Sequence, residues 1–329
     1  MDYGAILERS WQLTKRNKWL WVYGLVLAVL GGSGGGGGGG SGGGSAGSGT
    51  DKNLPEDLPE KTSQVLGAAT TAIKDWFSQV PVMTWVGVGL LILLLVVLFL
   101  ITRWILVNWA KGGLIAGLAA ADREEEVSLV STSGYGLKAV KPLVVLDLVG
   151  LGVGLLAILS LILVFGLLAF LIYLVPEPGR IILWVIEGII ALPTAIGVFL
   201  LLGVVGIYAD RLIVLEGVTP VAAWKRGLML GKGNFLPTLV MGIINSAVGC
   251  TAGCLSLLAL AVVLGIPAVV LLFPYFRGGW HWPPPGVWVG VGILGMIFIY
   301  GNLLVRIILT VFSYGNWNLF FKETMRKEQ

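Results

Sequence analysis

The candidate site residues are polar side chains within long apolar runs of the sequence: Asp147, Glu187, Asn245 and Arg306. Such groups are costly in hydrocarbon unless they are paired or hydrated, so they indicate either helix–helix bonds or a polar path for an ion or solute. Asp147 and Arg306 lie toward the same end of their runs and could pair across helices, while Asn245 and Asn302 could join interhelical hydrogen bonds. We expect structural pairing; a transport path is the alternative.

Residues that enzymes use for catalysis are scarce. The single histidine, His281, has no Cys, Asp or Glu nearby, which leaves little material for a metal site or a general base. Cys250 and Cys254 are four residues apart in an apolar run without a His or carboxylate nearby, and we interpret them as small packing residues. No phosphate-binding loop, nucleophile-elbow or His-Glu-x-x-His motif occurs. We predict no catalytic residue, no metal and no cofactor, and therefore not an enzyme.

The elements that carry the polar side chains are predicted to be membrane-spanning helices. Of the 329 residues, 56% are hydrophobic and only 12% are charged. Five apolar runs exceed the roughly 20 residues that cross about 30 Å of hydrocarbon, at about 82–108, 143–175, 181–208, 235–273 and 287–312. A sixth and shorter run, from Trp19 to Leu30, is interpreted as a helix; a secretory signal peptide is the alternative. The fold class is all-α, a polytopic integral membrane protein with about six transmembrane helices.

A repeated pattern organises these runs. The segments 9–20 and 226–236 match at Arg, Leu, Lys and Asn without a gap, and a fainter copy has Gly136-Leu137 followed by Lys141. The segments 111–141 and 209–234 are also related, since each contains Ala-Asp-Arg before an amphipathic stretch. Each unit would place one helix on the cytoplasmic surface and a hairpin of two helices in the bilayer. We therefore predict three repeated amphipathic-helix-plus-hairpin units.

The predicted domain organisation has three parts. Residues 1–30 form a cytoplasmic amphipathic segment and the first transmembrane helix. Residues 31–81 form an external linker, almost entirely Gly and Ser up to residue 49, followed by an amphipathic segment on the outer membrane face. Residues 82–329 form the remaining five helices of a single transmembrane domain with a cytoplasmic C-terminus.

Basic residues predict the orientation. With both termini in the cytoplasm, most of the 22 lysines and arginines fall on the cytoplasmic side, as in bacterial inner-membrane proteins. Two basic amphipathic segments are candidates for contact with lipid headgroups through Lys15, Arg16, Lys18, Lys225, Arg226 and Lys232. The alternative is that these charges only fix orientation.

The fourth long run is too long for one straight crossing, so it must tilt, project beyond the membrane or break. As one straight helix, 235–273 would extend about 58 Å, and Gly249 to Gly253 is the predicted position of the break. Small-residue faces at 150–154 and 286–295 would allow close helix contact and oligomerisation.

The order of basic helix, Lys-x-Asn junction and hydrophobic hairpin, with Ala-Asp-Arg-Leu-Ile-Val-Leu-Glu216 followed by Ala-Ala-Trp-Lys-Arg-Gly-Leu228, resembles a diffuse group of uncharacterised bacterial integral membrane proteins. That group is similar to the membrane domain found beside some glycerophosphoryl diester phosphodiesterases. The resemblance implies a membrane architecture. It implies no phosphodiesterase activity, because this chain has neither the soluble barrel nor the His/Glu/Asp set of such enzymes.

We interpret the chain as a non-enzymatic membrane scaffold or accessory protein. The expected partners are the lipid bilayer and either another membrane protein or a second copy of the chain; no nucleic acid is expected. The competing interpretation is a small transporter or channel with a polar path near Glu187, Asn245 and Arg306.

Overall fold

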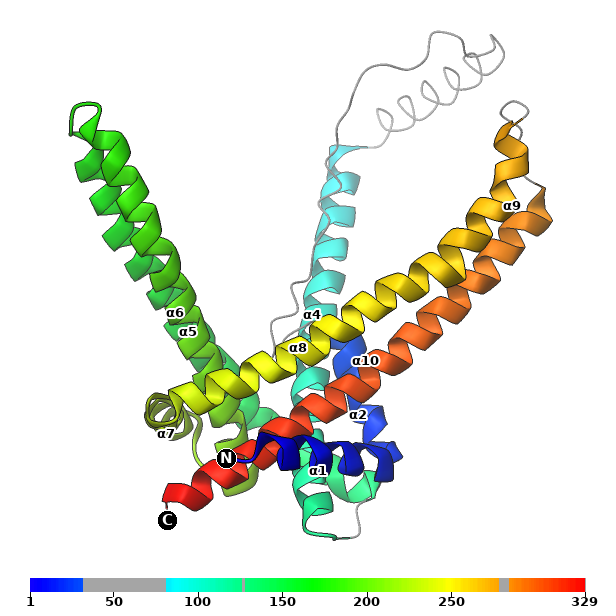
Figure 1. The fold of residues 1–329 in the computed structure, drawn as a ribbon, viewed down its shortest axis with the longest axis horizontal. Helices are drawn as coiled ribbons and strands as arrows, with labels where there is room; N and C mark the ends of the chain where they lie inside the picture. The colour runs from blue at the N-terminus through cyan, green and yellow to red at the C-terminus, as the bar shows by residue number, and fades with distance from the viewer. Residues whose placement is uncertain (32–80, 126–127, 278–283, 329) are drawn as a thin grey trace. The chain divides into compact units, whose positions relative to one another are not determined.

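The computed structural model describes residues 1–31, 81–125, 128–277 and 284–328, and within these ranges the regular structure is entirely helical (Figure 1). The helices are α1 (Tyr3–Arg16), α2 (Trp21–Leu30), α4 (Val82–Asp122), α5 (Leu129–Tyr173), α6 (Gly179–Glu216), α7 (Pro220–Gly233), α8 (Phe235–Leu260), α9 (Ile266–Arg277) and α10 (Pro285–Glu328). A 3₁₀ turn, η1 (Lys18–Leu20), precedes α2, and a π-helical segment, η2 (Ala261–Gly265), joins α8 to α9. Most of the predicted linker 31–81, and His281, lie outside the described residues.

Five of these helical stretches are long and apolar enough to cross a membrane: Met83–Asp122, Leu129–Tyr173, Gly179–Glu216, Phe235–Phe273 and Pro285–Lys327. The prediction of an all-α polytopic membrane protein is confirmed. The apolar stretch Lys18–Leu30 is shorter, so its role as a sixth span stays a prediction.

The chain divides into two compact units. One contains Met1–Gly40 and Trp104–Gln329, and the other contains Ser41–Arg103. The described part of the second unit is the first half of α4, whose large apolar side chains are exposed as expected for a lipid-facing helix. The first unit holds all the contacts described below.

The break in the fourth long run lies elsewhere than predicted. Gly249 and Gly253 are inside α8, and the irregularity is η2, which begins eight residues after Gly253. Pro267 is the second residue after η2, and its ring lacks an N–H and would clash with a carbonyl one turn earlier, within η2, if the helix were regular. Glycines in a helix, by contrast, allow a break without requiring one.

The surface helices α1 and α7 have the same length and the same ending. Each has 14 residues, and α1 ends at the cap residue Asn17 as α7 ends at Asn234. In both, the asparagine side chain donates to the carbonyl oxygen four residues earlier, that of Leu13 at 3.2 Å and that of Leu230 at 3.4 Å. The Lys-x-Asn motif therefore marks the end of a surface helix in both places.

The middle copy of the pattern behaves differently. The helix α5 begins after the cap residue Ser128, whose side chain accepts from the Ser131 backbone N–H at 3.2 Å, and continues for 45 residues without a break. Lys141 is followed by Pro142 rather than by x-Asn, and the helix accommodates this proline. The predicted amphipathic segment and the predicted span are therefore one helix here.

Two of the amphipathic segments approach the preceding hairpin very closely. At Gly227 of α7, an added Cβ would lie 3.0 Å from the Val205 carbonyl oxygen of α6. At Gly136 of α5, it would lie 2.7 Å from the Trp109 carbonyl oxygen of α4. Only glycine permits both crossings without a shift of the backbone.

The third crossing joins the first helix to the last. The Ser10 hydroxyl of α1 donates to the Phe312 carbonyl oxygen of α10 at 3.1 Å, and a Cβ at Gly315 would collide with the same hydroxyl. Each amphipathic segment thus packs against the second helix of a hairpin, and α1 packs against the hairpin at the other end of the chain.

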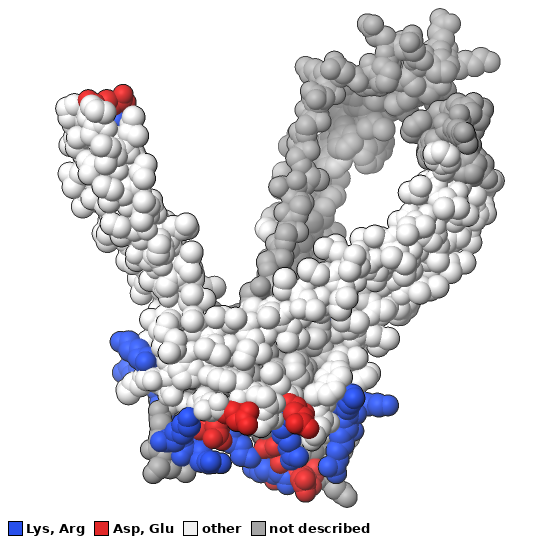
Figure 2. All heavy atoms as spheres, viewed as in Figure 1, with Lys and Arg blue, Asp and Glu red and all other residues white. Residues whose placement is uncertain are grey.

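Two apolar clusters surround these crossings. One includes Tyr208, Leu212 and Phe320, and the other includes Leu20 and Leu114. All five side chains are almost completely buried. Charged side chains gather beside them, at the end of the unit that carries α1, α7 and the C-terminal part of α10 (Figure 2). The buried apolar core therefore lies at the charged end of the unit. The helices beyond it expose apolar side chains on their surface, as helices in contact with lipid do.

The crossing at Gly227 can be tested by overpacking. We expect Gly227→Leu to lower the free energy of unfolding by about 1–3 kcal/mol, because the new side chain must displace the α6 backbone. Gly233→Leu is the matched control, since Gly233 belongs to the same helix and has open space around its Cβ position. Thermal unfolding in detergent measures both variants; equal unfolding temperatures would contradict a tight crossing.

Candidate functional site

The Asp147 carboxylate of α5 joins three side chains of α4. Its Oδ2 accepts a hydrogen bond from Trp104 Nε1 at 2.8 Å and one from Asn108 Nδ2 at 2.9 Å. Its Oδ1 lies 3.8 Å from Lys111 Nζ. The three donors are spaced three or four residues apart, so they share one face of α4. This carboxylate is therefore held by hydrogen bonds and by charge together.

Arg211 of α6 lies beside this group and is almost completely buried, with an exposed fraction of 3%. It donates through one terminal nitrogen to the Ile207 carbonyl oxygen at 2.7 Å, and its guanidinium carbon lies 6.0 Å from the Tyr314 ring centroid. Its Nε is also buried but has no hydrogen-bond partner among the described residues. Burying a guanidinium N–H without a hydrogen-bond partner costs free energy, unless another group accepts a hydrogen bond from it.

Asp210 completes the cluster. Its carboxylate interacts electrostatically with Lys111 and with Arg211. Two cations, Lys111 and Arg211, therefore lie near two carboxylates, Asp147 and Asp210, so the formal charges of the four side chains balance. Balanced charges are what a site in low dielectric requires. We call these four residues the charged cluster.

The charged cluster lines one end of a cavity of about 900 Å³. The other walls are mainly apolar and come from α5, α6, α7, α8 and α10; they include Gly150, Phe199, Leu200, Gly203, Gly206, Trp224, Phe235, Ile243, Cys250 and Trp317. A cavity of this size with a few polar groups at one end is typical of a small-molecule site.

The predicted pairing of Asp147 with Arg306 is wrong. Asp147 bonds to α4, while the Arg306 side chain is exposed on α10. Lys111, Asp210 and Arg211 were missed as site residues, because they lie beyond the apolar runs and count as loop charges by hydropathy alone. The repeated Ala-Asp-Arg motif was the signal that could have found Asp210 and Arg211.

The predicted amide bonds between helices are present. Asn316 Nδ2 of α10 donates to Asn245 Oδ1 of α8 at 2.9 Å, and both side chains are buried. Asn302 of α10 also donates to Ser256 of α8. These bonds hold α8 against α10, and Asn245 does not line the large cavity.

Glu187 stands apart from the other predicted polar residues. It is 7% exposed and lines a smaller, apolar pocket of about 290 Å³ between α5 and α6. Its Oε2 has no hydrogen-bond partner among the described residues. Arg180, which could have approached it, pairs with Glu177 instead. Glu187, Asn245 and Arg306 therefore lie in three separate environments.

The six predicted lipid-contacting side chains, Lys15, Arg16, Lys18, Lys225, Arg226 and Lys232, are all exposed. Lys15 Nζ lies 5.0 Å from the Trp11 ring centroid, and Arg226 pairs with Glu216 at 2.6 Å. Contact with headgroups stays a prediction.

Neither cysteine belongs to a metal-binding group. Cys250 and Cys254 are exposed free thiols on α8, and no cluster of three or more His, Cys, Asp or Glu side chains suited to a metal occurs in the described part of the chain.

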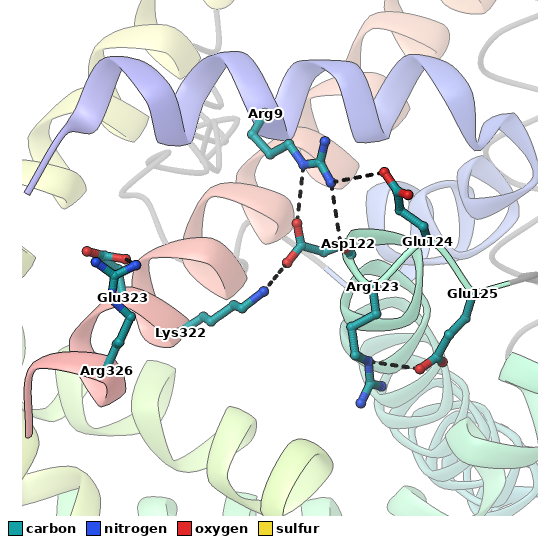
Figure 3. A network of polar contacts seen from close by, with 8 residues as sticks. All are labelled: Arg9, Asp122, Arg123, Glu124, Glu125, Lys322, Glu323 and Arg326. Atoms are coloured by element: carbon teal, nitrogen blue, oxygen red, sulfur yellow. Dashed lines mark hydrogen bonds and ion pairs between the residues drawn. The ribbon is translucent and has the colours of Figure 1, made fainter. Parts of the chain in front are cut away.

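A second charged group joins the first and last helices (Figure 3). The Asp122 carboxylate at the end of α4 accepts from Arg9 of α1 at 3.3 Å and from Lys322 of α10 at 2.6 Å. Its side chain is only 11% exposed. Arg9 also approaches Glu124 at 4.0 Å. Asp122 thus links three helices that come from the two ends and the middle of the sequence; we call this group the Asp122 junction.

No protein-family model matches this chain, and no curated protein or solved structure shows significant similarity to it.

The contacts of Asp147 lead to a stability prediction. Asp147→Ala should lower the free energy of unfolding by about 1–3 kcal/mol, because Trp104 and Asn108 lose their acceptor and Lys111 loses a charge partner. Asp147→Asn, which keeps one acceptor oxygen, should cost less. Arg306→Gln is the control and should leave the unfolding temperature within about 1 °C, as exposed substitutions usually do. A loss for Arg306→Gln as large as that for Asp147→Ala would contradict this assignment.

The Asp122 junction predicts a salt-dependent effect. Asp122→Asn should lower the unfolding temperature at low salt, since Arg9 and Lys322 would then approach each other without a carboxylate between them. Both cations are largely exposed, so about 1 M NaCl should reduce the difference from wild type. Glu125→Gln removes only the local pair with Arg123 and serves as control. If both variants behave alike, the junction does not join the helices.

Proposed function

We propose that this chain is a non-enzymatic membrane scaffold or accessory protein. In this proposal, the polar residues within the spans form hydrogen bonds that hold neighbouring helices together. The observation that carries this proposal is that Asp147, Asn245 and Asn302, three of the polar groups within the spans, all bond to side chains of a neighbouring helix. Groups used in this way stabilise a membrane fold but do not leave a polar path.

The three-unit architecture is part of the proposal. The helices α1 and α7 begin and end at positions 217 residues apart, as Tyr3 and Pro220 and then Arg16 and Gly233. Ser10 and Gly227, which make the close crossings, have the same spacing. Gly136 makes the third crossing in the fainter copy. This correspondence supports three repeated units, each with a hairpin, and hence six spans.

The orientation and the partner follow from the same units. We place both termini in the cytoplasm of a bacterial cell, with α1 and α7 on the inner surface of the cell membrane and their basic side chains toward anionic headgroups. The resemblance to the membrane domain beside some phosphodiesterases suggests a membrane-protein partner. Gly152 and Gly154 of α5 have open space at their Cβ positions, which supports a second copy or another helix packing there.

One observation favours the alternative, a small transporter. The cavity beside the charged cluster has a volume of about 900 Å³, enough for a small solute. The path first expected through Glu187, Asn245 and Arg306 would have to connect three sites that lie apart.

Cysteine accessibility in intact cells tests the proposal. Single cysteines replace Ser45, Gly279, Glu187 and Asn245 in a background that carries Cys250→Ser and Cys254→Ser. For a scaffold, a membrane-impermeant maleimide should label positions 45 and 279, in the predicted outer loops, and should leave 187 and 245 unmodified. Labelling that reaches 187 and 245 would reveal a water-filled path and replace the scaffold with the transporter.

A further inference from the structure

The cavity beside the charged cluster is polar at one end and apolar along the rest. Phe199 and Leu200 of α6 and Ile243 of α8 form part of its wall and are also exposed on membrane-spanning helices. Their surroundings in a bilayer are lipid chains. The apolar part of the cavity is therefore continuous with the hydrocarbon, and an occupant can have its chains outside and its polar end within.

Arg211 is one of two cations that line the polar end of the cavity. Arg211 Nε is buried without a partner among the described residues, although Asp210 lies next to it in the sequence. Lys111 lines the same end of the cavity and supplies a second cation. A phosphate oxygen is a strong acceptor for guanidinium and ammonium donors. The two cations therefore suit the phosphate of a headgroup.

The two carboxylates determine which net charge an occupant of the cavity can carry. Asp147 and Asp210 line the cavity together with the two cations, so the cluster is neutral as a whole. An occupant with a net negative charge would leave that charge uncompensated in a low dielectric. A headgroup that contains both a phosphate and an ammonium group has no net charge. Its ammonium N–H groups can donate hydrogen bonds to a carboxylate.

We propose that this cavity binds a zwitterionic phospholipid with a phosphate and a primary amine in its headgroup, the phosphate toward Arg211 and Lys111 and the ammonium toward Asp210. The acyl chains leave between α6 and α8. Trp224 of α7 forms part of the same wall, so the basic surface helix borders the site. This inference goes beyond the scaffold role, because it assigns a specific lipid to one site.

Native mass spectrometry of the full-length protein in detergent tests the preference. The probes are phosphatidylethanolamine and phosphatidylglycerol with identical acyl chains. We expect the first to bind with a Kd about tenfold lower, which is the factor that one charge-assisted hydrogen bond contributes. Asp210→Asn should reduce the ratio of the two Kd values to within about twofold. A Kd for phosphatidylglycerol equal to or below that for phosphatidylethanolamine would overturn the proposal.

A cavity-filling variant keeps the test independent of the buried charges. Gly206 lines the cavity one turn before Asp210 and has open space at its Cβ position, so Gly206→Phe should fill the site and raise the Kd of phosphatidylethanolamine at least tenfold. Gly188→Phe is the matched control on the same helix, outside the cavity, and should bind like wild type. Unchanged binding by Gly206→Phe would refute the site.

A soluble headgroup analogue separates a lipid from a free solute. Glycerophosphoethanolamine has the same phosphate and amine without acyl chains. We expect it to compete at least a hundredfold more weakly than the lipid, because the apolar wall contributes through the chains. Equal competition would assign the site to a soluble compound and overturn the lipid proposal.

Discussion

The close approach of helix backbones at three crossings is the constraint on which the first unit depends. Ser10, Gly136 and Gly227 occupy these crossings: a Cβ at Gly136 or Gly227 would meet a backbone carbonyl oxygen, and a Cβ at Gly315 would meet the Ser10 hydroxyl. The helices that they contact share an aromatic–small–polar sequence at the crossing, as Trp109-Ala-Lys111, Tyr208-Ala-Asp210 and Tyr314-Gly-Asn316. Small residues at the crossing allow the polar residue that follows to point inward. The charged cluster is thus a product of the backbone packing.

Hydropathy alone was enough to predict the helical membrane class and its five long spans. Local sequence was enough to predict where α1 and α7 end, since an asparagine cap acts through its own carbonyl contacts. The partners of Asp147 could not be predicted in this way. Lys111 lies beyond the hydropathy edge of its span, and it joins a partly buried cluster because Asp147 of α5 and the Asp210 and Arg211 side chains of α6 line the same cavity.

The break in the third hairpin shows a similar limit. The segment Gly249-Cys-Thr-Ala-Gly253 has low helix propensity. In lipid, however, the helix continues through it because unpaired backbone N–H and C=O groups are costly there. Pro267 removes a backbone donor just after the π-helical segment. Pro142 and Pro193, by contrast, lie inside α5 and α6 without such a segment, so neither glycine nor proline in the sequence is enough to locate the irregular turn.

The unbroken course of α5 joins its amphipathic segment directly to a span, whereas α1 and α7 end before the next helix begins. At 1.5 Å per residue, its 45 residues form a rod about 68 Å long that runs from the surface layer through the span. At Asn17 and Asn234, the surface helix and the helix that follows are separate elements. In α5 the two are one rod, so a tilt of the span would tilt the segment near Leu129 by the same angle.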